Sequence, residues 1–240
     1  MNWKQWIPPT LRLVYRVLQR ARDDQKSRFF DQLTRLQRPP GVSFPFGIEV
    51  VQPINQSAFF ENKIHNITLA SAAVRRVVIP PGAVFSFWSA VGYPGRLQGY
   101  RLGRNLVNGR VRGAYGGGLC QVSGMMYYLA LQAGLDVLER HNHSVDIYNE
   151  AERFAPLGSD ATVVFGYKDL RFRNNLSTAI CFELEVRGSH LHGRLCTTEP
   201  IVCYALDFIR VDSPGERHVR TEIAGNLVAR SVYLVRTAVI

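Results

Sequence analysis

A run of three glycines followed by a cysteine constrains this chain more than any other feature. Gly116, Gly117 and Gly118 precede Leu119-Cys120-Gln121, and an apolar stretch over 122–131 follows them. Glycine adopts backbone conformations that other residues avoid, so the run predicts a tight loop that leads directly into a helix. The first turn of a helix has free N–H groups and the positive end of the helix dipole, and both stabilise a thiolate. The pattern therefore predicts either a reactive cysteine or a tightly packed turn at a helix start.

Residues 1–40 differ in residue pattern from the rest of the chain, and this pattern predicts a basic, amphipathic, helical N-terminal extension. Apolar residues from Leu11 to Leu18 alternate with arginines, Thr10 is a candidate helix cap, and Pro39-Pro40-Gly41 ends the segment. Such a helix can dock on the main domain through its apolar stripe. It can also place residues 1–38 on an anionic membrane surface. The sequence leaves both alternatives open.

Residues 41–240 predict an α+β domain with a mixed or antiparallel sheet and a central helix that starts at the glycine loop. A second helix-compatible run covers 66–78, and Asn108-Gly109 predicts a hairpin turn. The predicted strands are 48–51, 84–88, 106–107, 110–111, 145–148 and 161–167, followed by C-terminal β-hairpins over 180–186, 191–195, 202–211 and 227–235. The C-terminal part, 187–240, is accordingly expected to be rich in β-structure.

The net charge of +10 favours anionic partners, and the hydrophobic content of 46% suits a packed core. No nucleic-acid-binding motif accompanies the basic residues, so we do not expect the chain to bind nucleic acid. No stretch approaches the roughly 20 apolar residues of a membrane-spanning helix, and the N-terminus does not read as a signal peptide. These observations predict a cytoplasmic protein that can attach to the membrane face.

The four cysteines, Cys120, Cys181, Cys196 and Cys203, are too few and too irregularly spaced for a disulfide scaffold. Their spacing also differs from that of structural zinc sites. Cys181 and Cys196 flank a predicted turn at 188–189 at equal distances, so they can face each other across a hairpin. Two buried free thiols are the favoured interpretation.

Three residues collect the predicted chemistry: Cys120 at a helix start, His143 at the beginning of a strand, and Asp160 at the beginning of the next strand. A thiol catalyst uses a histidine to take the thiol proton and a carboxylate to fix the imidazole tautomer. Gln121 or nearby backbone N–H groups would stabilise an oxyanion. The residues expected to line or brace this site are Gly117, Gly118, Gln121, Ser123, Glu139, Arg140 and His141.

Non-catalytic interpretations account for the same residues. Cys120 can serve as a small apolar residue at a tightly packed helix start, and Asp160 as a turn residue before a strand. His141 and His143 would share one face of a strand and could bind zinc together with Asp160 or Cys120. Our prediction is a site without a metal or another cofactor.

The ordered motifs along the chain resemble the VanW-like family over residues 66–186. The segments that carry the resemblance are Leu69-Ala70-Ser71-Ala72, Pro80-Pro81-Gly82-Ala83-Val84-Phe85-Ser86-Phe87, Val91-Gly92, Gly99-Tyr100, Gly116 to Ser123, Gly134-Leu135, Glu139-Arg140-His141-Asn142-His143-Ser144, Asp160-Ala161-Thr162-Val163 and Asp169 to Asn175. The order of helix-borne cysteine, histidine and aspartate is also similar to that in transglutaminase-like and papain-like cysteine enzymes, a weaker, architectural resemblance.

The family resemblance implies an association with the bacterial cell envelope more firmly than it implies a reaction. It is consistent with acyl transfer or amide hydrolysis by Cys120, His143 and Asp160 on a peptide-like substrate, such as a peptidoglycan-related peptide or another anionic envelope component. The alternative is a non-catalytic, envelope-associated binding or accessory protein.

Overall fold

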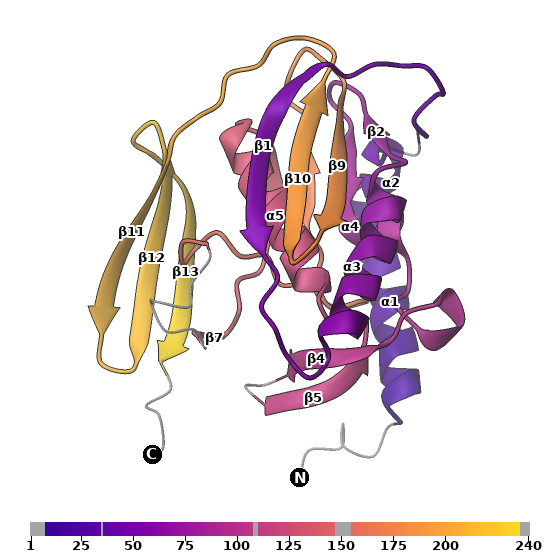
Figure 1. Ribbon diagram of the computed structural model, residues 1–240, viewed down its shortest axis with the longest axis vertical. Helices are drawn as coiled ribbons and strands as arrows, with labels where there is room; N and C mark the ends of the chain where they lie inside the picture. The colour runs from indigo at the N-terminus through magenta and orange to yellow at the C-terminus, as the bar shows by residue number, and fades with distance from the viewer. Residues whose placement is uncertain (1–7, 35, 108–109, 147–154, 236–240) are drawn as a thin grey trace.

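The computed structural model describes residues 8–34, 36–107, 110–146 and 155–235, and it confirms the predicted α+β class (Figure 1). Residues 1–7, the predicted hairpin turn at 108–109 and the second half of the strand predicted at 145–148 lie outside the described residues. No helix in the described part of the chain is long and apolar enough to cross a membrane.

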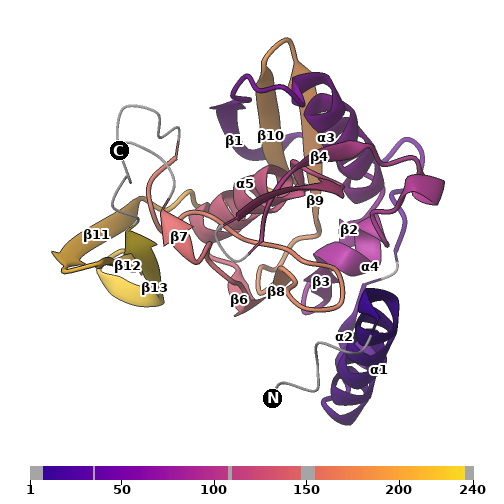
Figure 2. The same cartoon turned by 90° about the horizontal axis from the view of Figure 1, so that it is seen from below.

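The central layer is an antiparallel sheet with the strand order β1-β10-β9-β2, covered on one face by two helices. Its elements are β1 (Phe46–Pro53), β10 (His190–Thr197), β9 (Ile180–Arg187), β2 (Val78–Ile79), α3 (Phe60–Val74) and α5 (Leu119–Gln132). Helix α5 starts at the glycine loop as predicted, and Val122, Met125 and Leu129 are fully buried in it. Figure 2 shows α5 in the middle of the molecule.

The opposite face of this sheet carries a small second core. Cys181 on β9 and Cys196 on β10 are register partners, both are buried, and both are free thiols. They pack with Phe44 and Val78. The expectation that these cysteines face each other across a hairpin as buried thiols is met.

Two smaller sheets complete the part of the fold that surrounds α5. One has the order β3-β8-β6, and the other is a hairpin of β4 and β5. Their bounds are β3 (Val84–Ser86), β8 (Arg171–Arg173), β6 (Asp136–Glu139), β4 (Leu102–Val107) and β5 (Arg110–Tyr115), with the short helices α4 (Phe87–Val91) and η2 (Arg96–Gln98) between β3 and β4.

The C-terminal strands form a separate sheet with the order β11-β12-β13-β7 beside the central layer (Figure 1). Its strands are β11 (Leu206–Ser213), β12 (Glu216–Ile223), β13 (Asn226–Val235) and β7 (Val145–Asp146). Strand β13 pairs in parallel with β7, so that Leu234 is the register partner of Val145. The last described strand is thereby fixed to the segment that directly follows His143.

The N-terminal helices α1 (Pro9–Lys26) and α2 (Phe29–Gln32) dock on the edge of the fold. The Arg171 guanidinium donates to both carboxylate oxygens of Asp24 at 2.6 and 2.7 Å, and Arg20 pairs with Glu139. These ion pairs join α1 to β8 and β6. The division into an extension over 1–40 and a domain over 41–240 stays a prediction.

Several predicted boundaries are wrong. The segment 161–167 is not a strand: it has no regular secondary structure up to Val163 and then makes a turn closed by an isolated bridge between Val164 and Lys168. The strand predicted at 84–88 ends at Ser86, because the Ser86 hydroxyl accepts the Ser89 N–H at 3.2 Å and caps α4. Helix α3 starts earlier than predicted, at Phe60, and Pro8 rather than Thr10 precedes the first turn of α1.

Candidate active site

The glycine loop places Cys120 in the first turn of α5. Gly118 precedes the helix with a φ of +105°, a conformation that strains other residues. A Cβ atom at this position would lie 2.8 Å from Cγ of Lys63 on α3. Glycine is therefore required both by the backbone turn and by the close approach of α3. As a result, the Cys120 side chain lies at the positive end of the helix dipole.

His143 and Asp160 form a tight pair beside this helix start. The Asp160 carboxylate accepts two hydrogen bonds from His143 on Oδ2, one from the ring Nδ1 at 2.6 Å and one from the backbone N–H at 2.7 Å. With Nδ1 bound to the carboxylate, the opposite ring nitrogen is left for the cysteine. Asp160 thus fixes both the position and the tautomer of the imidazole.

Arg140 and Tyr233 hold the other side of Asp160. Arg140 donates to Asp160 Oδ1 at 3.0 Å and to the Asp160 carbonyl oxygen at 2.7 Å, and the Tyr233 hydroxyl also donates to Oδ1. The Arg140 side chain is only 6% exposed and lies over the Tyr127 ring at 4.8 Å. Burial alone would raise the pKa of Asp160, but its bonds to His143 and Arg140 hold that pKa far below its usual range.

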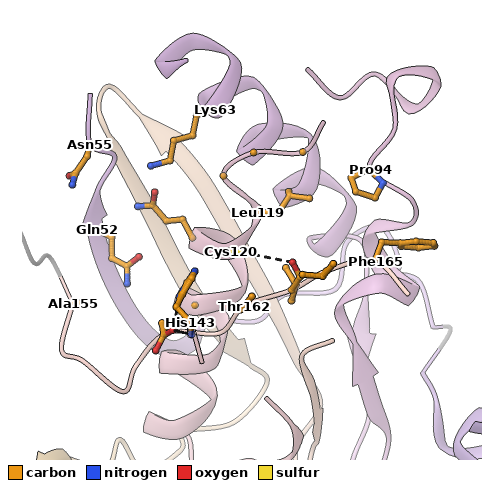
Figure 3. A pocket seen from close by; sticks show the side chains of 18 of the residues that line it. Gln52, Asn55, Lys63, Pro94, Leu119, Cys120, His143, Ala155, Thr162 and Phe165 are labelled. Atoms are coloured by element: carbon orange, nitrogen blue, oxygen red, sulfur yellow. Dashed lines mark hydrogen bonds and ion pairs between the residues drawn. The ribbon is translucent and has the colours of Figure 1, made fainter. Parts of the chain in front are cut away.

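The Cys120 thiol donates to the carbonyl oxygen of Val163 at 3.8 Å (Figure 3), and His143 lies in the same cleft wall close enough to shift the pKa of the thiol. Burial raises the pKa of Cys120. The interaction with His143 lowers this pKa by a larger amount, so the net shift is downward. Burial likewise opposes the charged form of His143, yet Asp160 and the Cys120 sulfur raise the pKa of His143 to about 10. Both shifts favour the thiolate form of Cys120 and the imidazolium form of His143 over the forms of the free residues.

A cleft of about 1300 Å³ opens in front of this pair and includes Cys120, His143 and Asp160 in its walls. Figure 3 shows two unlike arms on either side of Cys120. One arm carries the polar side chains of Gln52, Asn55 and Lys63, and the other carries Pro94 and Phe165. A ligand with a polar end and an apolar end could span the thiol.

The remaining predicted site residues divide into those in the cleft wall and those behind it. Gly117, Gly118 and Gln121 line the cleft. The Gln121 side-chain amide donates to the Pro53 carbonyl oxygen at 2.9 Å and ties α5 to the end of β1. Ser123 is buried and donates to the Ala161 carbonyl oxygen at 2.7 Å, which holds the segment after Asp160 against α5.

Glu139 and His141 do not line the cleft, and Glu139 faces α1. The His141 ring bonds Glu139 at 3.0 Å, and Glu139 also pairs with Arg20 and accepts the Asp169 backbone N–H at 2.9 Å. Burial opposes the charge on Glu139, but these bonds to His141 and Arg20 lower its pKa to about 2. These two residues brace the element that carries Arg140 and His143.

The zinc alternative finds no support in the geometry of the described residues. Among them, no cluster of three or more His, Cys, Asp or Glu side chains has an arrangement suited to a metal ion. His141 and His143 do not share a ligand position, because the His141 ring bonds Glu139 while the His143 ring bonds Asp160.

Sequence reasoning did not find Tyr233. It lies on β13, 73 positions from Asp160 in the chain, and is 1% exposed. The alternation of the last strand, in which Ser231 and Tyr233 face inward between exposed neighbours, marks it as an inward-facing residue. Nothing in that alternation connects it to Asp160, because the contact depends on how the C-terminal sheet packs.

Comparison of the sequence with known proteins places the chain in a family. A family model described as VanW like protein matches residues 62–196. The vancomycin B-type resistance protein VanW of Enterococcus faecalis (strain ATCC 700802 / V583) is 34% identical over 115 residues, which cover 48% of this chain and 42% of that protein. The uncharacterized protein YoaR of Bacillus subtilis (strain 168) is 32% identical over 131 residues, covering 55% of this chain and 42% of that protein. The matches thus span less than half of each relative, and no solved structure matches significantly.

Proposed function

This chain belongs to the VanW-like family, and we propose that it is a cysteine-dependent acyl transferase or amide hydrolase with Cys120 as the nucleophile. One observation carries the proposal: a cysteine, a histidine that lowers the pKa of this cysteine, and a carboxylate that holds this histidine line one cleft. Charged side chains of this kind are destabilising in an ordinary protein core. Their combination in one cleft is typical of nucleophilic catalysis.

In the first half-reaction, the Cys120 thiolate attacks the carbonyl carbon of a bound amide and forms a tetrahedral intermediate. The backbone N–H of Cys120 lies in the first turn of α5, where the N–H of Leu119 and that of Gln121 already donate to Gly116 and Gly118. This N–H and the helix dipole would stabilise the oxyanion. As the carbon–nitrogen bond breaks, His143 gives its proton to the leaving amine, and an acyl thioester remains on Cys120.

In the second half-reaction, neutral His143 acts as a base. It takes a proton from water or from an acceptor amine, which attacks the thioester carbonyl carbon. The carbon–sulfur bond breaks, the acid or the new amide leaves, and Cys120 returns as a thiolate beside protonated His143. Asp160 keeps Nδ1 bound throughout, so the imidazole does not turn away between the two steps.

The two arms of the cleft support a peptide-like substrate. The Gln52 and Asn55 amides can pair with backbone groups of an extended peptide, while Pro94 and Phe165 offer an apolar wall on the other side of the thiol. One relative is named for vancomycin resistance, so we propose a cell-envelope peptide, such as a peptidoglycan stem or its precursor, as the substrate class.

A non-catalytic binding protein is the second candidate, and one observation favours it. The Gln121 side chain, which the sequence offered as an oxyanion donor, already donates its amide to the Pro53 carbonyl oxygen. An oxyanion would then depend on backbone donors alone, which weakens the case for catalysis. In that case the cleft would hold an envelope ligand without reacting with it.

The two candidates are separated by incubating the protein with a panel of short peptide thioesters and measuring its intact mass. An enzyme gains the acyl mass on Cys120, the Cys120→Ser variant does not, and Cys203→Ser, which removes the exposed cysteine, behaves like wild type. If peptidoglycan fragments bind in calorimetry while no peptide thioester acylates Cys120 faster than it acylates Cys203, the binding function is correct.

A further inference from the structure

We propose that the outward face of α1 binds the surface of an anionic lipid bilayer. This face consists of Leu11, Val14, Tyr15 and Leu18, which we call the outer stripe, and their exposed fractions are 59%, 55%, 65% and 58%. Four large apolar side chains exposed to this extent on neighbouring helical turns form a contiguous apolar surface. The proposal does not depend on the reaction proposed for Cys120.

The outer stripe is not needed to dock α1, because the helix docks through its opposite side. Leu13 and Val17 pack on the turn at Gly166, where a Cβ atom would lie 2.9 Å from Leu13 Cδ1 and 3.1 Å from Val17 Cγ2. Arg20 and Asp24 continue the same side with their ion pairs to Glu139 and Arg171. At 3.6 residues per turn, these four positions lie on the face opposite the outer stripe. The alternatives of docking and membrane contact are therefore compatible.

The charges around the outer stripe favour an anionic lipid surface. Arg12, Arg22 and Lys26 are exposed beside it or in line with it. Two acidic residues belong to this part of α1: Asp23 is exposed, and Asp24 is paired with Arg171 on the docked side. A helix with one apolar face flanked by basic residues lies in the headgroup region with its apolar side chains inserted. The basic side chains add attraction to anionic headgroups that salt screens.

The position of α1 gives this contact a geometric consequence. Figure 2 shows α1 at the margin of the molecule, and Pro9 and Leu13 from its first half also line the cleft that contains Cys120. Binding of the outer stripe would hold the mouth of the cleft next to the bilayer surface.

The test is co-sedimentation of the full chain with vesicles of phosphatidylcholine, with and without phosphatidylglycerol, at low and high salt. We expect binding only to the vesicles with phosphatidylglycerol, and weaker binding at high salt. The double variant Leu11→Glu/Leu18→Glu should bind at least about tenfold more weakly, because two inserted apolar side chains are lost. Arg12→Glu/Arg22→Glu should weaken binding roughly 20-fold or more, at about fivefold per basic residue.

Matched controls are Leu97→Glu and Val211→Glu, which change apolar residues of 96% and 60% exposure away from α1 and should leave binding unchanged. Thermal unfolding verifies that each variant is folded. If the Leu11→Glu/Leu18→Glu protein is destabilised, binding by the Arg12→Glu/Arg22→Glu variant decides the test. Wild-type levels of binding in both double variants, or no binding by wild type, would overturn the proposal. The proposal would also be overturned if light scattering showed a dimer of the wild-type protein and a monomer of the Leu11→Glu/Leu18→Glu variant, because the outer stripe would then bind a second copy of the chain.

Discussion

At the scale of single residues, the protonation states of Cys120 and His143 decide what the candidate site can do. The pKa of Cys120 is lowered mainly by His143 against the effect of burial, while that of His143 is raised to about 10 by Asp160 and the sulfur. Asp160 has two opposite effects, because its charge stabilises the imidazolium but disfavours the nearby thiolate. Its bonds to Arg140 and Tyr233 hold it in the position from which it acts on the imidazole.

Replacing Asp160 by Asn should lower the pKa of His143. The variant removes the carboxylate hydrogen bond and its charge, which are two of the causes that raise this pKa, while burial continues to lower it. A raised pKa stabilises the protonated form up to the folded-state value. The pH at which the imidazolium loses its proton should therefore fall from about 10 by at least about one unit. NMR titration of the His143 ring measures this, and an unchanged titration would contradict the role of Asp160.

At the scale of elements, the segment from Glu139 to His143 contacts several separate parts of the fold. In an extended chain successive side chains point to opposite sides. Glu139 pairs with Arg20 on α1, accepts the Asp169 backbone N–H and bonds His141. On the other side, Arg140 and Asn142 donate to Ser231 on β13 at 2.5 Å and to the Val232 carbonyl oxygen at 2.7 Å. His143 then meets Cys120 at the start of α5. One short segment thus joins the N-terminal helix, the central layer and the C-terminal sheet.

The Glu139 carboxylate should make the free energy of unfolding depend on pH in the acid range. Its pKa is about 2 in the folded protein against an ordinary value of 4.5, so its contribution is complete above pH 4.5 and is lost as the pH falls toward 2. Glu139→Gln should therefore lose roughly 2–3 kcal/mol relative to wild type at neutral pH, and this difference should shrink in acid.

Urea unfolding of both proteins at several pH values measures this difference. The matched control is Glu185→Gln, which changes a 59% exposed carboxylate paired with Arg187 and should cost less than about 1 kcal/mol at any pH. A difference between wild type and Glu139→Gln that does not vary with pH would show that the ion pairs of Glu139 do not fasten α1.

The sequence predicted the elements whose signals are local. The glycines before Cys120 indicated the start of α5, and the order of motifs indicated His143 and Asp160 as its partners. The strand predicted from the apolar residues at 161–167 is wrong, because Val163 and Phe165 line the cleft and do not pair with a neighbouring strand. The two-sided character of α1 depends on the turn at Gly166, which is distant in the chain. Long-range contacts of this kind leave no periodic signal.

At the scale of the whole molecule, a sheet outside the range of the family match contributes side chains to the candidate site. The family model ends at residue 196, while Tyr233 and Ser231 on β13 hold Asp160 and Arg140. Strand β13 also pairs with β7 immediately after His143. Folding of the C-terminal sheet and formation of the site should therefore be energetically coupled.

A double-mutant cycle between Tyr233→Phe and Asp160→Asn measures this coupling. A hydrogen bond to a charged group contributes about 1.5–3 kcal/mol, so Tyr233→Phe should destabilise the wild type by that amount and the Asp160→Asn variant by much less. Tyr128→Phe is the control, because Tyr128 stacks on Phe208 at 6.2 Å and lies outside the Asp160 network. Equal effects of Tyr233→Phe in both backgrounds would mean that the C-terminal sheet does not support the site.

The most direct test of the central claim is the pH dependence of Cys120 alkylation by iodoacetamide. It is measured in a Cys203→Ser background, because Cys203 is exposed whereas Cys181 and Cys196 are buried. The account predicts that the reactive thiolate persists below the ordinary thiol pKa of about 8.5, and that His143→Ala raises the apparent pKa, since the strongest influence that opposes burial is then lost. Alkylation with an ordinary pKa, unchanged by His143→Ala, would contradict the assignment of Cys120 as an activated nucleophile.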